Sequence, residues 1–132
     1  MTDHQSALRQ EVWLLRSRES RRIFDATVAI GHLGGERQRF VVRAQDLPAI
    51  DASLRTDVMA SLLAQSGVAP VAGWLIRSGS PTVHDEDLHW LAAATSSFGI
   101  HARPLGGFYA ITRAGWLDVR SGESKVWCRL RL

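Results

Sequence analysis

Three stretches of the chain carry residues that repeat at the spacing of an amphipathic helix. The first helix is expected over residues 5–18, where Thr2 or Asp3 can cap its start. Asp51 is a good N-cap for the second helix. The third should begin at residues 85–87, whose three acidic side chains suit a helix N-terminus. The repeating positions are Leu8, Val12 and Leu15, then Leu54, Val58, Leu62 and Leu63, and finally Leu88, Leu91, Ala92 and Thr95.

Shorter apolar runs predict the strands of a sheet. The run at residues 71–76 has the length of a strand that is covered on both faces. Further strands are expected at residues 107–112, 116–119 and 125–132. In the last of these, Cys128 falls on the apolar face, where we expect it to be buried and unreactive. That face consists of Val126, Cys128, Leu130 and Leu132, which alternate with Trp127, Arg129 and Arg131.

Residues 22–31 fit two different structures. They can continue the first helix until the glycine pair at 34–35 ends it. They can equally form a strand, and we favour this interpretation, with residues 32–35 as a turn into a partner strand at 38–43. One face of the first strand would carry Phe24, Ala26, Val28 and Ile30.

The order of these elements predicts an α/β fold that borders on α+β, with a central mixed β-sheet flanked by helices. We expect a single domain over residues 1–132, made of an N-terminal amphipathic helix (1–20) and a sheet-containing core (22–132). Residues 71–111 would form a strand–helix–strand unit, which is right-handed if its strands are parallel.

Composition favours a folded protein over a disordered one, because 45% of the residues are apolar and 22% are charged. No apolar run reaches the roughly 18–20 residues that span a bilayer. Residues 1–5 do not resemble the start of a signal peptide. The single Cys128 cannot form an internal disulfide. We therefore expect a cytoplasmic protein without membrane partners.

Charge is unevenly distributed along the chain, whose formal net charge is +3. Residues 1–44 hold eight Lys or Arg against five Asp or Glu, and residues 100–132 hold six against two. The segment between them holds two against six, so the ends are basic and the middle is acidic. Basic ends can bind phosphate, which makes nucleic acid one partner to consider. A mixed, solvated surface rich in Arg explains the same composition.

Aromatic and basic side chains near the two ends form the candidate binding surface. Trp13 and Arg16 belong to the first helix, whereas Trp127, Arg129 and Arg131 share one face of the last strand. Trp and Arg together can stack on bases or anchor a protein partner, although a Trp also serves in core packing. Self-association is expected through the terminal strand or the N-terminal helix, because a sheet edge or an apolar helix stripe can pair with a second copy.

The densest group of ionisable side chains lies at the start of the third helix. His84 and Asp87 are three positions apart and could meet on one helical face to bind a metal or move a proton. Helix-start chemistry explains the same residues, because acidic side chains are favoured there. His84 and Asp87 are the candidate catalytic residues, and we expect no cofactor.

Residues 78–87, Ser-Gly-Ser-Pro-Thr-Val-His-Asp-Glu-Asp, resemble a motif of the RadC-like branch of the JAB/MPN fold. In that branch a strand ends in His-Asn-His, and the sequence Pro-Ser-Gly-Asp-Pro-Thr-Pro-Ser follows before Asp-Glu-Asp opens a helix. The order of predicted elements over residues 23–119 is also similar, as is Phe-Gly-Ile at 98–100. The family includes zinc-dependent isopeptidases, so the resemblance implies a JAB/MPN-like core.

The resemblance does not extend to the metal ligands. The family's motif is His-x-His, seven residues, then Ser-x-x-Asp, and its four positions fall on Trp74, Ile76, His84 and Asp87. Only Asp87 keeps its residue type, and the side chains of Trp and Ile offer no lone pair to zinc. The family's general base, an upstream Glu, would fall near residues 38–39, which are Gln and Arg. A hydrolytic zinc site needs about three protein ligands and an activated water, so the resemblance implies a member that has lost its metal site.

We therefore expect a non-catalytic interaction or scaffold module on a degenerate JAB-like core. A nucleic-acid-binding protein that uses its Arg-rich ends is the first alternative. A hydrolase with a relocated site near His84 and Asp87 is the second. The three hypotheses differ in their partner, which is a protein or a second copy, a phosphate backbone, or a metal ion with a substrate.

Overall fold

A computed structural model of the chain describes residues 3–67, 69 and 71–129. Its helices are α1 (Asp3–Arg18), α2 (Ala52–Gln65) and α3 (Asp85–Ile100), with a 3-10 helix η1 (Ala44–Ala49) ahead of α2. Its strands are β1 (Ala26–Gly31), β2 (Arg37–Val42), β3 (Val71–Ile76), β4 (Leu105–Ile111), β5 (Gly115–Asp118) and β6 (Ser124–Val126).

The six strands form one mixed sheet in the order β2-β1-β3-β4-β5-β6, so the predicted α/β class is confirmed. β1 pairs antiparallel with both β2 and β3, and β4, β5 and β6 are antiparallel neighbours. β3 and β4 run parallel, and α3 is the crossover between them. The strand–helix–strand unit predicted for residues 71–111 is therefore present, and β3 is an interior strand.

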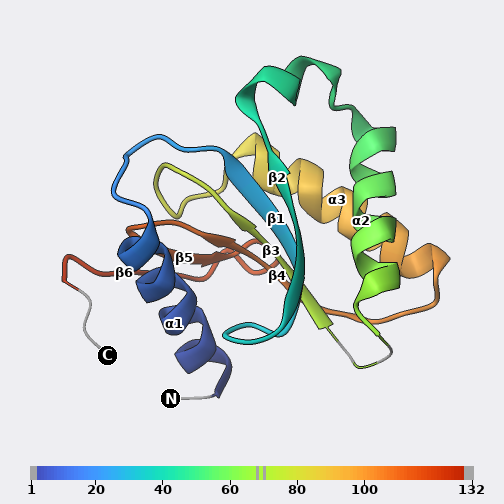
Figure 1. Cartoon of the computed structure of the whole chain (residues 1–132). Coiled ribbons are helices and arrows are strands. Elements are labelled where there is room, and N and C mark those ends of the chain that lie inside the picture. The colour runs from blue at the N-terminus through green and yellow to red at the C-terminus, as the bar shows by residue number, and fades with distance from the viewer. Residues whose placement is uncertain (1–2, 68, 70, 130–132) are drawn as a thin grey trace.

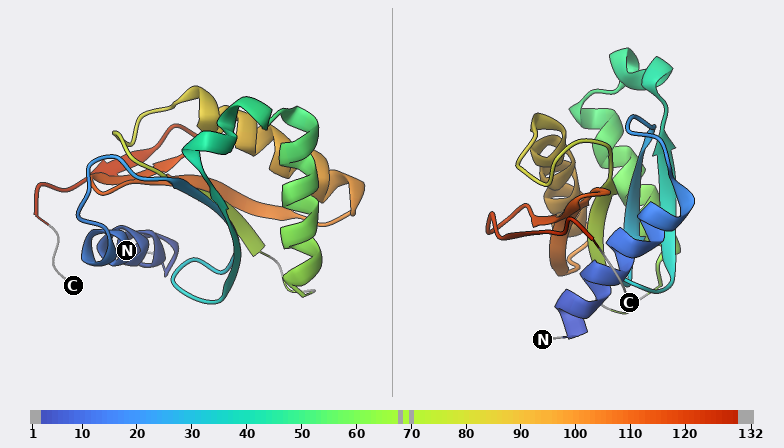
Figure 2. Two further views of the ribbon diagram at one scale, coloured as in Figure 1. Left: turned by 45° about the horizontal axis from the view of Figure 1, so that its top comes forward. Right: turned by 90° about the vertical axis from the view of Figure 1, so that its left-hand side faces the viewer.

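Helices cover both faces of the sheet. α2 and α3 lie side by side on one face, and α1 lies on the other (Figure 1, Figure 2). Side chains alternate between the two sides of a strand, so each face has its own core. In β3, Leu75 packs on the side of α2 and α3, whereas Trp74 and Ile76 pack on the side of α1. The prediction that residues 71–76 are covered on both faces is confirmed.

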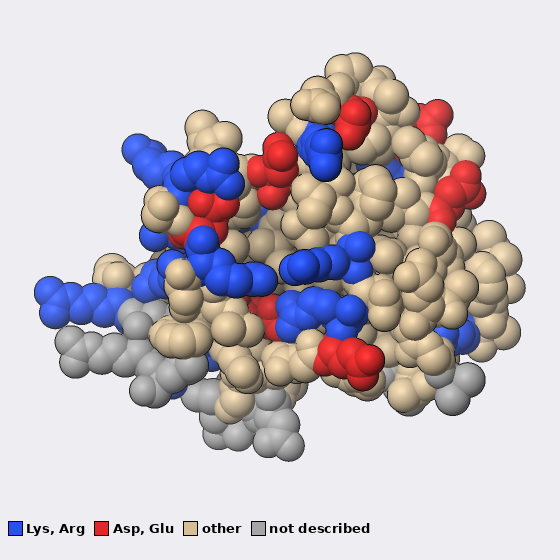
Figure 3. Space-filling view, in the orientation of Figure 1, with Lys and Arg blue, Asp and Glu red and all other residues tan. Residues whose placement is uncertain are grey.

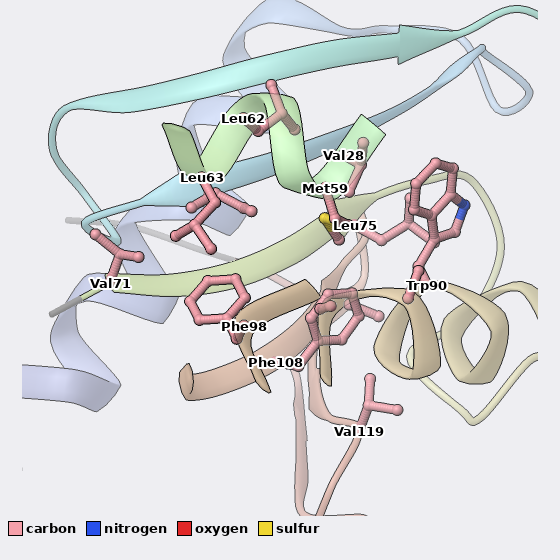
Figure 4. Packing of buried hydrophobic residues seen from close by; sticks show 14 of the residues in the cluster. Val28, Met59, Leu62, Leu63, Val71, Leu75, Trp90, Phe98, Phe108 and Val119 are labelled. Carbon is pink, nitrogen blue, oxygen red and sulfur yellow. The ribbon is translucent and has the colours of Figure 1, made fainter. Parts of the chain in front are cut away.

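The larger core, which we call the helix-pair core, fills the space between the sheet and the helices α2 and α3. Figure 4 shows Met59 and Leu63 of α2 and Trp90 and Phe98 of α3 gathered around Leu75 of β3. Burial of one side chain of this size contributes about 1.5–3 kcal/mol, so this layer holds both helices on the sheet. Its fully buried members also include Val28, Ile30, Ala94, Phe108 and Ala110.

A second core, the α1 core, lies between α1 and the sheet. Leu8, Val12 and Leu15 are buried there, as the helical spacing of residues 5–18 predicts. Near the start of α1, His4 Nε2 lies 2.8 Å from the hydroxyl of Tyr109 in β4. Burial raises the pKa of Tyr109 to about 12, so its hydroxyl stays protonated at neutral pH. The other members of the α1 core are Ala29, Trp74, Ile76, Ile111 and Trp116.

Of the two structures considered for residues 22–31, the strand is present, so the alternative prediction of a continued helix was wrong. β1 begins at Ala26 and pairs with β2, and the turn between them is closed by a 2.8 Å hydrogen bond from the His32 amide to the Glu36 carbonyl. Phe24 lies ahead of the strand rather than within it. Gly34 adopts a φ of +74°, a conformation that side-chain-bearing residues seldom take, which explains the glycine in this turn.

The last strand is shorter than predicted, and its two faces are reversed. β6 ends at Val126, and residues 130–132 lie outside the described part of the chain. Val126 is 58% exposed and Cys128 is exposed, whereas Trp127 packs against the α1 core. The expectation that Cys128 is buried was therefore wrong.

The N-cap of α2 provides a test of local structure. Asp51 Oδ1 accepts a hydrogen bond from the Leu54 amide at 2.8 Å. Asp51→Ala is expected to lower the free energy of unfolding by about 1 kcal/mol, because an amide at the helix start loses its partner. Urea denaturation measures the change. Asp51→Asn should keep most of the stability, and an equal loss in both variants would contradict the capping role.

Candidate functional site

The loop between β3 and α3 folds around a buried arginine. Arg77 directly follows β3 and is 5% exposed, and Asp87 in the first turn of α3 is fully buried. Arg77 Nε lies 2.7 Å from Asp87 Oδ1, and Nη2 lies 2.8 Å from Oδ2. A two-point contact between guanidinium and carboxylate is both strong and directional. The ion pair therefore fixes the start of α3 against the end of β3.

The remaining N–H groups of Arg77 hold the loop itself. Nη1 donates to the carbonyls of Ser78 and Ser80, each at 3.0 Å, and Nη2 donates to the carbonyl of Thr82 at 2.9 Å. With the two bonds to Asp87, the side chain makes five hydrogen bonds, which equals its number of N–H groups. Arg77 is thus the centre around which residues 78–82 are arranged.

The two candidate catalytic residues meet in a helix cap. Asp87 Oδ2 accepts a hydrogen bond from the His84 amide at 2.9 Å, and the Asp87 amide donates to the His84 carbonyl at 3.0 Å. Both oxygens of Asp87 are already bound by Arg77, so a metal ion could reach this carboxylate only by displacing a buried guanidinium. Within the described residues, no three His, Cys, Asp or Glu side chains come together as a metal-binding group.

Core residues fill the positions at which the JAB/MPN motif places its two histidines. Trp74 is fully buried and Ile76 is 8% exposed, both in the α1 core. Ile76 and Arg39 line a groove of about 430 Å³ beside α1 and β2. His84 instead lines a groove by the start of α3, next to members of the helix-pair core. The four positions of the motif are therefore split between the two sides of the sheet.

We call the groove lined by His84 the β3–α3 groove, because it opens where β3 ends and α3 begins. It has a volume of about 400 Å³, and most of its lining is apolar. Leu75 and Trp90 are buried side chains of this lining, whereas Ile23 and Leu47 are 83% and 46% exposed. Exposed apolar side chains beside a concave surface are typical of a binding site. The other apolar lining residues are Phe24, Ala26, Val42 and Ala44.

Acidic side chains also line the β3–α3 groove. These are Asp25, Asp85 and Glu86, of which Glu86 contacts Arg55 at 3.5 Å. The arginine in the lining, Arg77, is neutralised by its ion pair. The groove thus combines apolar surface with negative charge, which favours an apolar ligand that also carries positive charge.

The candidate binding residues near the chain ends do not form one exposed surface. The Arg16 guanidinium donates to two backbone carbonyls, and the bond to that of Trp127 is 2.7 Å long. Trp127 is itself half-buried against the α1 core. Trp13, 38% exposed, and Arg129 remain accessible, and Arg131 lies outside the described residues. Arg16 and Trp127 therefore connect α1 to the C-terminal segment.

Basic side chains gather over β2 and around the end of α1 (Figure 3). Arg37 of β2 forms an ion pair with the buried Glu11 of α1, and its guanidinium lies 4.8 Å from the centroid of the Trp74 ring. The groove beside α1 and β2 carries both signs of charge, which does not single out a phosphate ligand. Its charged lining residues are Arg18, Arg37, Arg39, Glu19 and Asp25.

Arg77 and Glu11 are not among the residues whose role we predicted from the sequence. For Arg77 the sequence offers only part of a signal: an aspartate stands at the third position of the next helix, but no local pattern shows that the arginine is buried and needs a counter-charge. Glu11 gave no comparable signal, since its position on α1 also suits a solvated side chain.

Among the described residues, no helix combines the length and the apolar character that crossing a membrane would require. The resemblance of residues 78–87 to the JAB/MPN motif stays a prediction. Comparisons with protein-family models, with curated proteins and with solved structures each yield no match to the chain.

Proposed function

We propose that this chain is a non-catalytic interaction module whose β3–α3 groove holds an apolar segment of a partner peptide. The observation that carries the proposal is the ion pair between Arg77 and Asp87. In the JAB/MPN motif the aspartate at this position binds a metal ion, whereas here the Arg77 guanidinium already binds the Asp87 carboxylate. Bulky side chains, Trp74 and Ile76, stand at the histidine positions. What the site offers to a ligand is the apolar groove beside the ion pair.

The chemistry of the partner follows from the lining of the groove. An apolar side chain of the partner would cover Leu47, which the fold leaves 46% exposed. Burying one side chain of this size stabilises a complex by about 1.5–3 kcal/mol. Asp25, Asp85 and Glu86 favour a Lys or Arg next to that apolar residue. The chain itself carries this pattern at residues 129–132, Arg-Leu-Arg-Leu, so a second copy is one such partner.

A labelled peptide with two Arg-Leu-Arg-Leu repeats tests the proposal by fluorescence anisotropy. Leu47→Gln is expected to weaken its binding by at least about tenfold, because apolar surface in the groove is lost. Leu54→Gln is the matched control, since Leu54 is 41% exposed on α2 but does not line the groove. A peptide with Gln in place of Arg should bind more weakly to the native chain, because it lacks the positive charge that the acidic lining favours.

Equal affinity of the native chain and Leu47→Gln, or equal binding of the peptides that carry Arg and Gln, would contradict the proposal. Sedimentation velocity at rising protein concentration shows whether the partner is a second copy. Binding of single-stranded DNA that falls steeply with salt would favour the nucleic-acid alternative. Stoichiometric zinc that is lost in His84→Ala would favour the hydrolase alternative.

A further inference from the structure

A second hollow adjoins the β3–α3 groove and differs from it in chemistry. It has a volume of about 770 Å³ and lies between the segment that precedes β1, the loop after β3 and the turn after β4. Figure 1 shows the loops after α1 and after β3 at the same end of the sheet. Ile23, Phe24 and Ser78 line both the hollow and the groove, so the two are continuous.

Among the described residues, the charged side chains that line the hollow are Arg22 and Arg113, and none of the lining residues is acidic. In the described part of the chain, neither side chain donates a hydrogen bond, and Arg113 Nε is buried without a partner. Glu19 lies near enough to Arg113 to interact electrostatically, but its carboxylate is held by Arg21 at 2.7 and 2.9 Å. The hollow therefore contains unneutralised positive charge.

The loop after β3 adds a backbone donor to these arginines. The Ser78 carbonyl points at Arg77, and in a trans peptide the N–H of the next residue points the opposite way. The Gly79 N–H is thus directed away from Arg77, and within the described residues it has no hydrogen-bond partner. The Ser78 hydroxyl is also unpaired there. Gly79 has a φ of +95°, and a Cβ would lie 3.0 Å from His84 Cε1, so the loop needs glycine here.

We propose that this hollow is an oxyanion site, which binds a carboxylate or phosphate group through Arg22, Arg113 and the Gly79 amide. Guanidinium groups and a free backbone N–H are the donors that proteins use for such oxygens. The site deepens the proposed function, because the occupant of the neighbouring groove would carry its anionic group next to its apolar side chain. A free peptide carboxylate and a phosphorylated side chain are the two sources of such a group.

NMR titrations of the ¹⁵N-labelled chain with inorganic phosphate and with acetate, at constant ionic strength, test the site directly. We expect saturable shifts of the Gly79 amide and of the Arg113 Nε–H signal. Arg113→Gln and Arg22→Gln should each weaken binding by about tenfold. Arg43→Gln is the matched control, because Arg43 is an exposed arginine that does not line the hollow. Tighter binding of phosphate points to a phosphorylated partner, and binding of acetate that is equal or tighter points to a carboxylate.

The proposed oxyanion site and the proposed peptide-binding groove can be disproved independently of each other. Leu47→Gln should leave phosphate or acetate binding unchanged, because Leu47 lines the groove but not the hollow. Retained anion binding with no peptide binding would disprove the proposed function and keep the oxyanion site. Chemical-shift changes that do not saturate with anion concentration, or that do not include the Gly79 amide, would disprove the site. Changes that persist unchanged in both Arg22→Gln and Arg113→Gln would also disprove it. Arg22 is exposed, so its variant tests the site even if Arg113→Gln does not fold.

Discussion

Replacing Asp87 with asparagine is expected to lower the free energy of unfolding by about 3–5 kcal/mol. The Arg77 side chain is 5% exposed and would keep its charge without a carboxylate to balance it, because a guanidinium does not lose its proton in a protein. Asparagine has a similar shape but offers one acceptor oxygen where two are used now. Urea denaturation followed by circular dichroism measures the loss.

Two further variants distinguish the contribution of the ion pair to stability from that of a negative charge at the start of α3. Asp85→Asn removes an exposed carboxylate from the same turn of α3, and we expect it to cost about 0.3–1 kcal/mol. The double variant Arg77→Met with Asp87→Leu leaves no unbalanced charge but also removes the donors to the carbonyls of Ser78, Ser80 and Thr82, so it should be no more stable than Asp87→Asn. A loss for Asp87→Asn no larger than that for Asp85→Asn would show that the buried pair is not a structural requirement.

The regular elements could be predicted because their patterns are strong. Leu8, Val12 and Leu15 repeat at helical spacing, and all three are buried under α1. The run at residues 71–76 is apolar throughout, and the structure places it in the interior of the sheet with helices on both faces. The choice between helix and strand at residues 22–31 depended on the turn that follows, where Gly34 supplies the conformation that a hairpin requires.

The faces of the last strand could not be predicted from alternation alone. A period of two residues separates Val126 and Cys128 from Trp127, but it does not say which set points inward. In the fold, α1 covers this side of the sheet, and the large ring of Trp127 packs there while Val126 and Cys128 stay exposed. The position of α1 is a tertiary property, so no local pattern encodes this outcome.

Arg77 illustrates a similar limit for the candidate site. At the end of an apolar strand an arginine usually marks the return to solvent. Here it is buried because three carbonyls of the following loop and the carboxylate of Asp87 surround it. If the chain does share an ancestor with JAB/MPN proteins, one cation has replaced another: Asp87 is needed for a guanidinium rather than for a metal. Such a replacement would account for an Asp87 that keeps its residue type while the other three positions of the motif change.

Trp74→Ala is expected to lower the free energy of unfolding by about 3–5 kcal/mol. Trp74 is fully buried in the α1 core, and its ring supports the Arg37 guanidinium at 4.8 Å. Removing the indole would open a cavity under α1 and take away a contact of the ion pair between Arg37 and Glu11. Trp13→Ala is the matched control on α1, because Trp13 is 38% exposed and should lose about 0.5 kcal/mol or less. Urea denaturation followed by circular dichroism compares the two.

Trp74→Phe separates packing from hydrogen bonding at the same position. The Trp74 Nε1 atom is buried without a partner among the described residues, so phenylalanine loses ring volume but also removes an unsatisfied donor. We expect a loss of less than about 1.5 kcal/mol, well below that of alanine. If Trp74→Ala costs no more than Trp13→Ala, the indole does not hold α1 on the sheet.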